Sequence, residues 1–443
     1  MRRRLTAGAA LVMALVMFLT ATTIAWQGAV SIKGPDTAAL KATEEILGRV
    51  SRLRGLEIKH QVKSGFKTKD EIGESVIKDL DEGNTPEEFD ATTKMLLKLG
   101  LVPAGFPLRD FLVKLLREQV AGFYEPKTKE FYLAAWLPVA EQKTVIAHEL
   151  VHALQDQHFN LRRFEKWPKG DSDAELAAHA LVEGDATLVM FQYAFDQQGM
   201  RMDLSAIGSL TDKLLEQGDD DDKEKYPVLS SAPSVLREGL QFPYVYGIGF
   251  VQEVLKKRSL DQLNSIYTDL PTSTEQVMHP ERYLVRDHPV RIELADLTST
   301  LGAGWKQIDA DVNGEFGYHT ILAEYVAKRL AHLAAEGWDG DRYALYEDGK
   351  TGALLLAHYT TWDSERDAKE FFEIYIERTE KRYHVDRTSE LNAQHRVYET
   401  SDGLVSIELR NSDVVIVEGA RTREQLDRAA QKLWESRKNA SPR

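Results

Sequence analysis

Two histidines separated by three residues carry the clearest chemical signal in the sequence. His148 and His152 stand at positions i and i+4 of the mostly apolar stretch 145–152. On a helix both imidazoles would face the same way and could bind one ion. Neutral imidazole is a good ligand for Zn²⁺. Glu149 directly follows His148 and could take a proton from a water beside that ion, so the pattern predicts a metal site with a general base next to it.

A catalytic zinc site has three protein ligands and one open position. The chain contains no cysteine, so the third ligand must be a histidine, aspartate or glutamate. The helix expected at 174–197 carries three candidates spaced four residues apart, and helical spacing brings them to one face: Glu175, His179 and Glu183. Spacing alone leaves the choice among them open.

The segment from about residue 110 to 290 resembles the gluzincins, a branch of the HExxH zinc metallopeptidases (peptidase MA-like) with extracytoplasmic members. The resemblance rests on the run His-Glu-Leu-Val-His at 148–152, followed by Leu-Val-Glu-Gly-Asp-Ala at 181–186. In gluzincins a glutamate on the next helix completes the zinc site. The resemblance therefore implies His148, His152 and Glu183 as zinc ligands and Glu149 as the catalytic base. His179 is the rival third ligand, and Glu175 comes after it.

Other residues extend this resemblance. The run Phe-Pro-Tyr-Val-Tyr-Gly at 242–247 resembles the Pro-Tyr-x-x-Gly element of gluzincin aminopeptidases, whose tyrosine hydroxyl donates a hydrogen bond to the oxyanion. It implies that role for Tyr244, with Tyr246 as the alternative. Asp156 stands where comparable peptidases carry an acid, and Asp185 could orient a ligand imidazole. The aminopeptidase motif Gly-x-Met-Glu-Asn is absent, which favours an endopeptidase.

Two further stretches lie near the expected site. Residues 118–124 fall where gluzincins have the sheet edge that pairs with an extended substrate. Residues 273–280 could form a wall of the cleft, and His279 beside Pro280 is more typical of a structural loop than of a metal ligand.

The elements that must position these residues are mainly helical. Apolar spacing predicts helices at 40–53, 71–80, 86–99 and 108–120, with one short strand at 56–62 among them, and later helices at 144–159, 174–197 and 233–257. A hairpin is expected at 122–133. The acidic run 218–223 lacks regularly spaced apolar residues and is expected to be a solvated loop.

The pattern changes after about residue 305. A helix is expected at 321–336 and two more at 364–383 and 422–435, with strands at 342–346, 353–360, 396–400, 404–409 and 413–417. We therefore predict an α+β protein. Residues 41–305 would form a mainly helical, zincin-like metallopeptidase domain with a small edge sheet. Residues 306–443 would form a small α+β domain with an antiparallel sheet.

The N-terminal residues indicate where in the cell the protein is located. Arg2, Arg3 and Arg4 precede an uncharged, mostly apolar stretch that is long enough to cross a bilayer. We expect residues 1–26 to be a signal anchor or a signal peptide and 27–40 a linker. The bulk of the chain would then lie outside the cytoplasm, anchored to the membrane or secreted after cleavage. The formal net charge of −14 argues against nucleic acid as a partner.

These features predict zinc-dependent hydrolysis of peptide bonds in peptide or protein substrates. The alternative is a non-catalytic metal-binding envelope or surface protein whose C-terminal domain binds a ligand. Glu149 favours the enzyme, because a structural metal site does not need it, and structural zinc sites are usually closed by a fourth protein ligand, often a cysteine.

Overall fold

The computed structural model describes residues 37–119, 122–136, 139–202, 207–216, 226–385 and 389–439. The expected signal segment 1–26 and acidic run 218–223 lie outside these residues. The first described helix, α2, begins at Thr37, inside the range expected to be a linker. Within the described ranges, no helix is both long and apolar enough to cross a membrane.

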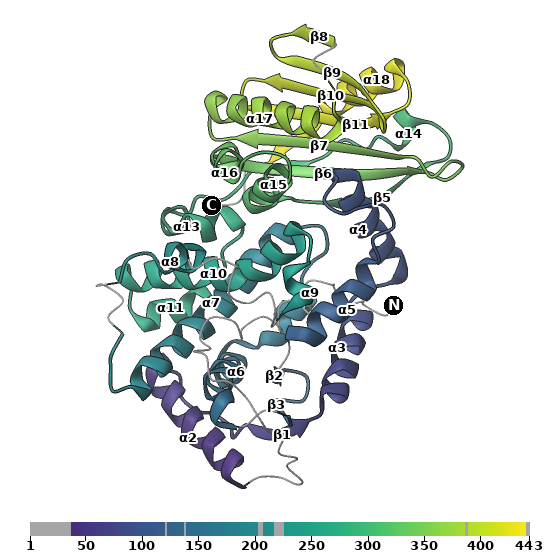
Figure 1. The fold of residues 1–443 in the computed structure, drawn as a ribbon. Helices are drawn as coiled ribbons and strands as arrows, with labels where there is room; N and C mark the ends of the chain where they lie inside the picture. Colours follow the sequence, from purple (N-terminus) through teal and green to yellow (C-terminus); the bar gives the residue numbers. More distant parts are fainter. Residues whose placement is uncertain are drawn as a thin grey trace.

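The protein is α+β, as predicted, with a mainly helical part at one end and a seven-stranded sheet at the other (Figure 1). A small three-stranded sheet in the order β1-β3-β2 lies in the lower part of the helical region, beside α6 and α3. Its strand β1 is parallel to β3, and β2 is antiparallel to β3. The elements of the helical part are α2 (Thr37–Arg54), β1 (Lys63–Lys67), α3 (Lys69–Gly83), α4 (Pro86–Leu99), α5 (Leu108–Gln119), β2 (Gly122–Glu125), β3 (Glu130–Ala134), α6 (Val139–Phe159), the 3₁₀ helix η1 (Leu161–Lys166), α7 (Ser172–Gln197), α8 (Leu210–Glu216), α9 (Pro227–Ser230), α10 (Ser234–Lys257), α11 (Leu260–Ile266), α12 (Thr274–Met278) and α13 (Pro280–Val285).

The seven-stranded sheet is antiparallel throughout and has the order β5-β6-β7-β11-β10-β9-β8. Helix α17 covers one face with α15 and α16, and α18 covers the other. The elements of this part are β4 (Arg291–Glu293), α14 (Thr298–Leu301), β5 (Trp305–Asp311), α15 (Gly314–Ala323), α16 (Lys328–Ala335), β6 (Trp338–Asp348), β7 (Leu354–Trp362), α17 (Glu365–Tyr383), β8 (Ser389–Asn392), β9 (His395–Thr400), β10 (Gly403–Arg410), β11 (Asp413–Ala420), α18 (Arg423–Leu433) and β12 (Arg437–Asn439).

Two expected elements were wrong in detail. The strand placed at 56–62 begins only at Lys63, because the backbone N–H groups of Lys59 and His60 donate to the side chain of Gln157 rather than to a strand. The single helix expected at 321–336 is two helices, α15 and α16. The turn between them buries Val326 and lets the hydroxyl of Tyr325 donate to the carbonyl of Gly100.

The helical part and the sheet share one hydrophobic core. Side chains of α4 and α5, such as Leu99 and Leu112, belong to the same buried cluster as α17 and strands β6, β7 and β10. A buried ion cluster strengthens this joint: Glu418 of β11 accepts from Arg378 at 2.7 Å, and Arg378 also donates to the carbonyl of Leu99 at 2.6 Å. Burial alone would raise the pKa of Glu418, but the charges of Arg378 and Arg382 hold it well below its usual range.

Helices α6 and α7 form the centre of the helical part, and the sequence explains why both are buried. Apolar residues of α6 are fully buried, among them Ile146, Ala147, Leu150 and Val151. Small side chains dominate one stretch of α7, with Ala177, Ala178 and Ala180 also fully buried. Small residues allow neighbouring helices to approach closely, so α7 can pack against several elements at once.

Helices α7 and α10 approach each other closely. A Cβ added at Gly184 of α7 would lie 2.1 Å from the backbone of Gly247, and one added at Gly247 would lie 2.1 Å from the carbonyl oxygen of Ala180. No side chain fits between these backbones. This contact fixes the position of α7 immediately beside Glu183.

Gly247→Ala should therefore destabilise the protein by about 1–3 kcal/mol or more, because the new methyl group overlaps a rigid backbone. Gly239→Ala is the matched control in the same helix, since a Cβ there meets nothing within 4 Å. It should leave stability unchanged or raise it by up to about 1 kcal/mol through better helix propensity. Urea denaturation followed by circular dichroism measures both. Equal stabilities for the two variants would contradict the tight crossing.

Candidate metal centre

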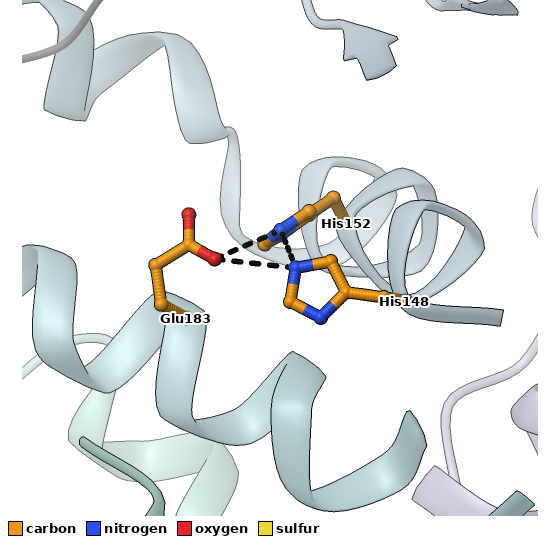
Figure 2. Close-up of side chains that lie close together, drawn as sticks. All are labelled: His148, His152 and Glu183. Carbon is orange, nitrogen blue, oxygen red and sulfur yellow. Dashed lines mark hydrogen bonds and ion pairs between the residues drawn. The ribbon is translucent and has the colours of Figure 1, made fainter. Parts of the chain in front are cut away.

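The structure brings His148, His152 and Glu183 together at the crossing of α6 and α7 (Figure 2). The two Nε2 atoms of the histidines lie 2.8 Å apart. The Oε2 atom of Glu183 lies 3.2 Å from Nε2 of His148 and 3.4 Å from Nε2 of His152. All three side chains are buried. One carboxylate oxygen and two imidazole nitrogens thus converge on a single point.

These donors fit a tetrahedral metal ion. Zinc bonds to histidine and carboxylate are about 2.0–2.2 Å long, so ligand atoms around a tetrahedral zinc stand about 3.3 Å apart. The three distances between donor atoms run from 2.8 to 3.4 Å. Two nitrogens and one oxygen are also a donor set that zinc accepts. Among the residues that the structure describes, this is the group of histidine and acidic side chains close enough to share an ion.

The electrostatics of the site favour positive charge at this point. Burial opposes ionisation of all three side chains, yet the Glu183 carboxylate raises the pKa of His152 to about 9. The histidines in turn lower the pKa of Glu183 to about 2 against the effect of burial. Burial and the charge of His152 lower the pKa of His148 to about 4. One negative charge buried between two imidazoles is stabilised by a cation.

Glu149 lies beside this group but is held by a different element. Its Oε2 atom accepts a hydrogen bond at 2.8 Å from the backbone N–H of Tyr124 in β2. Burial raises the pKa of Glu149 to about 7, although His152 and the Tyr124 N–H act in the opposite direction. A carboxyl group with a pKa near neutrality can accept and return a proton at physiological pH.

The rival ligands of α7 lie elsewhere. His179 is buried one turn before Glu183, and its ring centroid is 6.3 Å from that of Phe164. Its Nε2 atom is 4.0 Å from Oε1 of Glu175. Neither His179 nor Glu175 belongs to the group that converges with His148 and His152. The structure therefore brings Glu183, and neither rival, to the two histidines.

The two tyrosines of α10 have different neighbours. The ring centroid of Tyr244 is 6.3 Å from that of His148, and the side chain is buried. Tyr246 instead stacks on Phe242 with their centroids 4.9 Å apart, and burial raises its pKa to about 12. Of these two tyrosines, Tyr244 is thus the one next to His148 in the candidate metal centre.

The two acids singled out from the sequence have indirect roles. Asp156 accepts from the hydroxyl of Tyr124 at 3.0 Å and from the backbone N–H of Leu161 at 2.9 Å, so it ties the hairpin to α6. Asp185 reaches His152 only through Gln155, whose amide donates to Asp185 at 3.1 Å. Sequence reasoning missed Gln155, although its position three residues after His152 on the same helix could have indicated it.

The two further segments named from the sequence, 118–124 and 273–280, contain residues that connect neighbouring helices. Glu118 of α5 accepts from the backbone N–H groups of Val228 and Leu229, at the start of α9. In the segment 273–280, Thr274 donates to Asp173 at the start of α7. His279 lies 2.9 Å from Oε1 of Glu315 in α15. This segment joins α7 to the helices beneath the large sheet.

Glu183→Ala should release most of the metal, whereas His179→Ala should leave metal content near that of the wild type. Loss of a residue that only supports a ligand typically costs about 10–100-fold in affinity, so loss of a ligand should cost more. Metal content of the purified variants, measured by atomic emission, tests both. Retention of a full equivalent by Glu183→Ala together with its loss from His179→Ala would point to a site of three histidines.

Comparison with protein-family models matches residues 300–430 to DUF8575, a domain of unknown function. The match extends from the end of α14 into α18 and covers the large sheet, and it includes none of the residues of the candidate metal centre. No curated protein and no solved structure matches the chain.

Proposed function

We propose that this chain is a zinc-dependent metallopeptidase of the gluzincin type that cleaves peptides or proteins. One observation carries the proposal: two imidazole nitrogens and a carboxylate oxygen converge at 2.8 to 3.4 Å in a buried site. The buried Glu149 carboxyl is near enough for the charges of His152 and Glu183 to act on its pKa. The group supplies three protein ligands from the described residues, the number that a catalytic zinc site uses.

In this proposal His148, His152 and Glu183 hold the zinc ion. When bound, zinc supplies Lewis acidity, which polarises a peptide carbonyl and lowers the pKa of water toward about 7. Glu149 removes the proton of the attacking water and later delivers it to the nitrogen of the leaving amine. The hydrogen bond from the Tyr124 N–H holds the carboxyl of Glu149 in place. Tyr244, beside His148, donates its hydroxyl proton as a hydrogen bond to the oxygen that gains negative charge.

The setting of this activity is also a proposal. Arg2, Arg3 and Arg4 followed by an uncharged apolar stretch support a segment that inserts into the membrane with its positive end inside. The catalytic part would then work outside the cytoplasm, at the membrane surface or secreted after cleavage. The absence of the Gly-x-Met-Glu-Asn motif supports cleavage within chains rather than from a free N-terminus.

Glu149→Gln should bind zinc like the wild type and lose hydrolysis by at least about 10²–10⁴-fold, because the amide has nearly the shape of the carboxylate and cannot act as a base. The measurements are zinc content and cleavage of casein or of a quenched fluorescent peptide library by the full chain. His152→Ala is the matched control and should lose both zinc and activity. A Glu149→Gln variant as active as the wild type would contradict the proposed role, and zinc binding by an inactive wild type would favour the non-catalytic alternative.

Tyr244→Phe should reduce kcat by roughly 10²–10³-fold and change KM little, since a donor to the developing oxyanion acts in the transition state. Tyr246→Phe is the control on the same helix and should keep wild-type kinetics, because its ring stacks on Phe242. Steady-state kinetics on a single peptide substrate distinguish the two. The same kcat for Tyr244→Phe and wild type would remove Tyr244 from the mechanism.

A further inference from the structure

A chain of buried hydrogen bonds leads from the candidate ligand His152 to helix α2. The Nδ1 atom of His152 lies 2.8 Å from Oε1 of Gln155. The Nε2 atom of Gln155 donates to the backbone carbonyl of Val182 at 3.0 Å and to Asp185 at 3.1 Å. Gln155 and Asp185 are both fully buried, so water does not compete for these bonds.

Asp185 is fixed by two further donors from separate elements. Its Oδ1 atom accepts from Nε of Arg54, the last residue of α2, at 2.6 Å. Its Oδ2 atom accepts from the hydroxyl of Tyr267, which follows α11, at 2.7 Å. Arg54 and Tyr267 are as deeply buried as Asp185. Four segments of the helical part therefore meet at this carboxylate.

These contacts determine which way the amide of Gln155 points. A backbone carbonyl can only accept a hydrogen bond, so the group facing Val182 must be the NH₂. The carboxylate of Asp185, already surrounded by the donors Arg54 and Tyr267, requires the same NH₂. The amide oxygen must then face His152, and only a protonated Nδ1 can donate to it. In the neutral ring, the form that binds a metal, the lone pair of His152 is then on Nε2, which faces His148 and Glu183.

We propose that Gln155 is a positioning residue that holds the proton of His152 on Nδ1 and turns Nε2 toward the metal, and that Arg54 and Tyr267 hold Gln155 in this role through Asp185. This inference rests on the metal site of the proposed function. Through Arg54, helix α2 would then support the metal site, although none of its residues is a ligand. His148 is held differently, because its buried Nδ1 has no hydrogen-bond partner among the described residues.

The test measures metal binding by the full chain rather than peptide cleavage. Gln155→Leu removes both hydrogen-bonding functions and should weaken zinc binding by about 10–100-fold, as loss of an outer partner of a ligand histidine does. Competition with a chromophoric chelator gives the affinity. The visible absorption bands of the Co²⁺-loaded protein should shift as well, since they report the orientation of the ligands. Wild-type affinity and an unchanged Co²⁺ spectrum in Gln155→Leu would overturn the positioning role and leave the metal site itself intact.

Two matched variants separate positioning from general stability. Tyr267→Phe removes only the hydroxyl that binds Asp185, and it should weaken zinc binding in the same direction by a smaller factor, even if Gln155→Leu fails to fold. Gln252→Leu is the control: Gln252 is an equally buried glutamine of α10 that binds the loop carbonyls of Ile207 and Gly208. It should keep wild-type affinity and spectrum, and a loss as large as that of Gln155→Leu would overturn the proposal. If the wild type binds neither Zn²⁺ nor Co²⁺, the metal site and this inference both fail.

Discussion

A single carboxylate buried between two imidazoles is the interaction on which the organisation of the helical part depends. Glu183 lies 3.2 Å from His148 and 3.4 Å from His152, and all three side chains are buried. Removing such groups from water is costly unless charges and hydrogen bonds compensate one another. The favourable arrangement therefore requires α6 and α7 to cross at one particular height and rotation. A shift of one residue along either helix would bury the same charges without partners.

Several structural features maintain this crossing. The glycines at 184 and 247 allow α10 to press directly against the backbone of α7, which prevents α7 from moving away from α6. The hairpin of β2 and β3 holds α6 in place through Tyr124, whose backbone N–H donates to Glu149 and whose hydroxyl donates to Asp156. The buried ion pair of Arg54 and Asp185 joins α2 to α7, two residues after Glu183. Rigid packing around a polar site is what allows its donors to stay aligned without water.

The large sheet is joined to this centre through buried contacts rather than through a flexible connection. Leu99 and Leu112 pack into the core beneath the sheet, and Arg378 bridges Glu418 of the sheet to the end of α4. The segment 273–280 forms a second connection: Thr274 of α12 donates to Asp173 of α7, and His279 contacts Glu315 of α15. The part matched to a domain of unknown function thus shares buried contacts with the helical part that carries the candidate metal centre.

The sequence by itself determined the fold class and the helix that carries the two histidines. Helical spacing is a local property, so His148 and His152 share a face wherever that helix packs. The periodic spacing of apolar residues likewise predicted the helices α4, α6, α7 and α10. Local pattern also indicated most strands of the large sheet. It failed at 56–62, where a side chain of α6 binds the backbone, and at 321–336, where a buried turn interrupts the helix.

Only the tertiary structure decided which residues join the histidines. Glu175, His179 and Glu183 share a helix face, and the height at which α7 crosses α6 brings Glu183 alone to the pair. The same holds for Tyr244 against Tyr246, since the rotation of α10 depends on its contact with α7. Gln155, Asp185, Arg54 and Tyr267 come from segments far apart in the chain. Their association depends on packing between helices, which no local pattern of residues encodes.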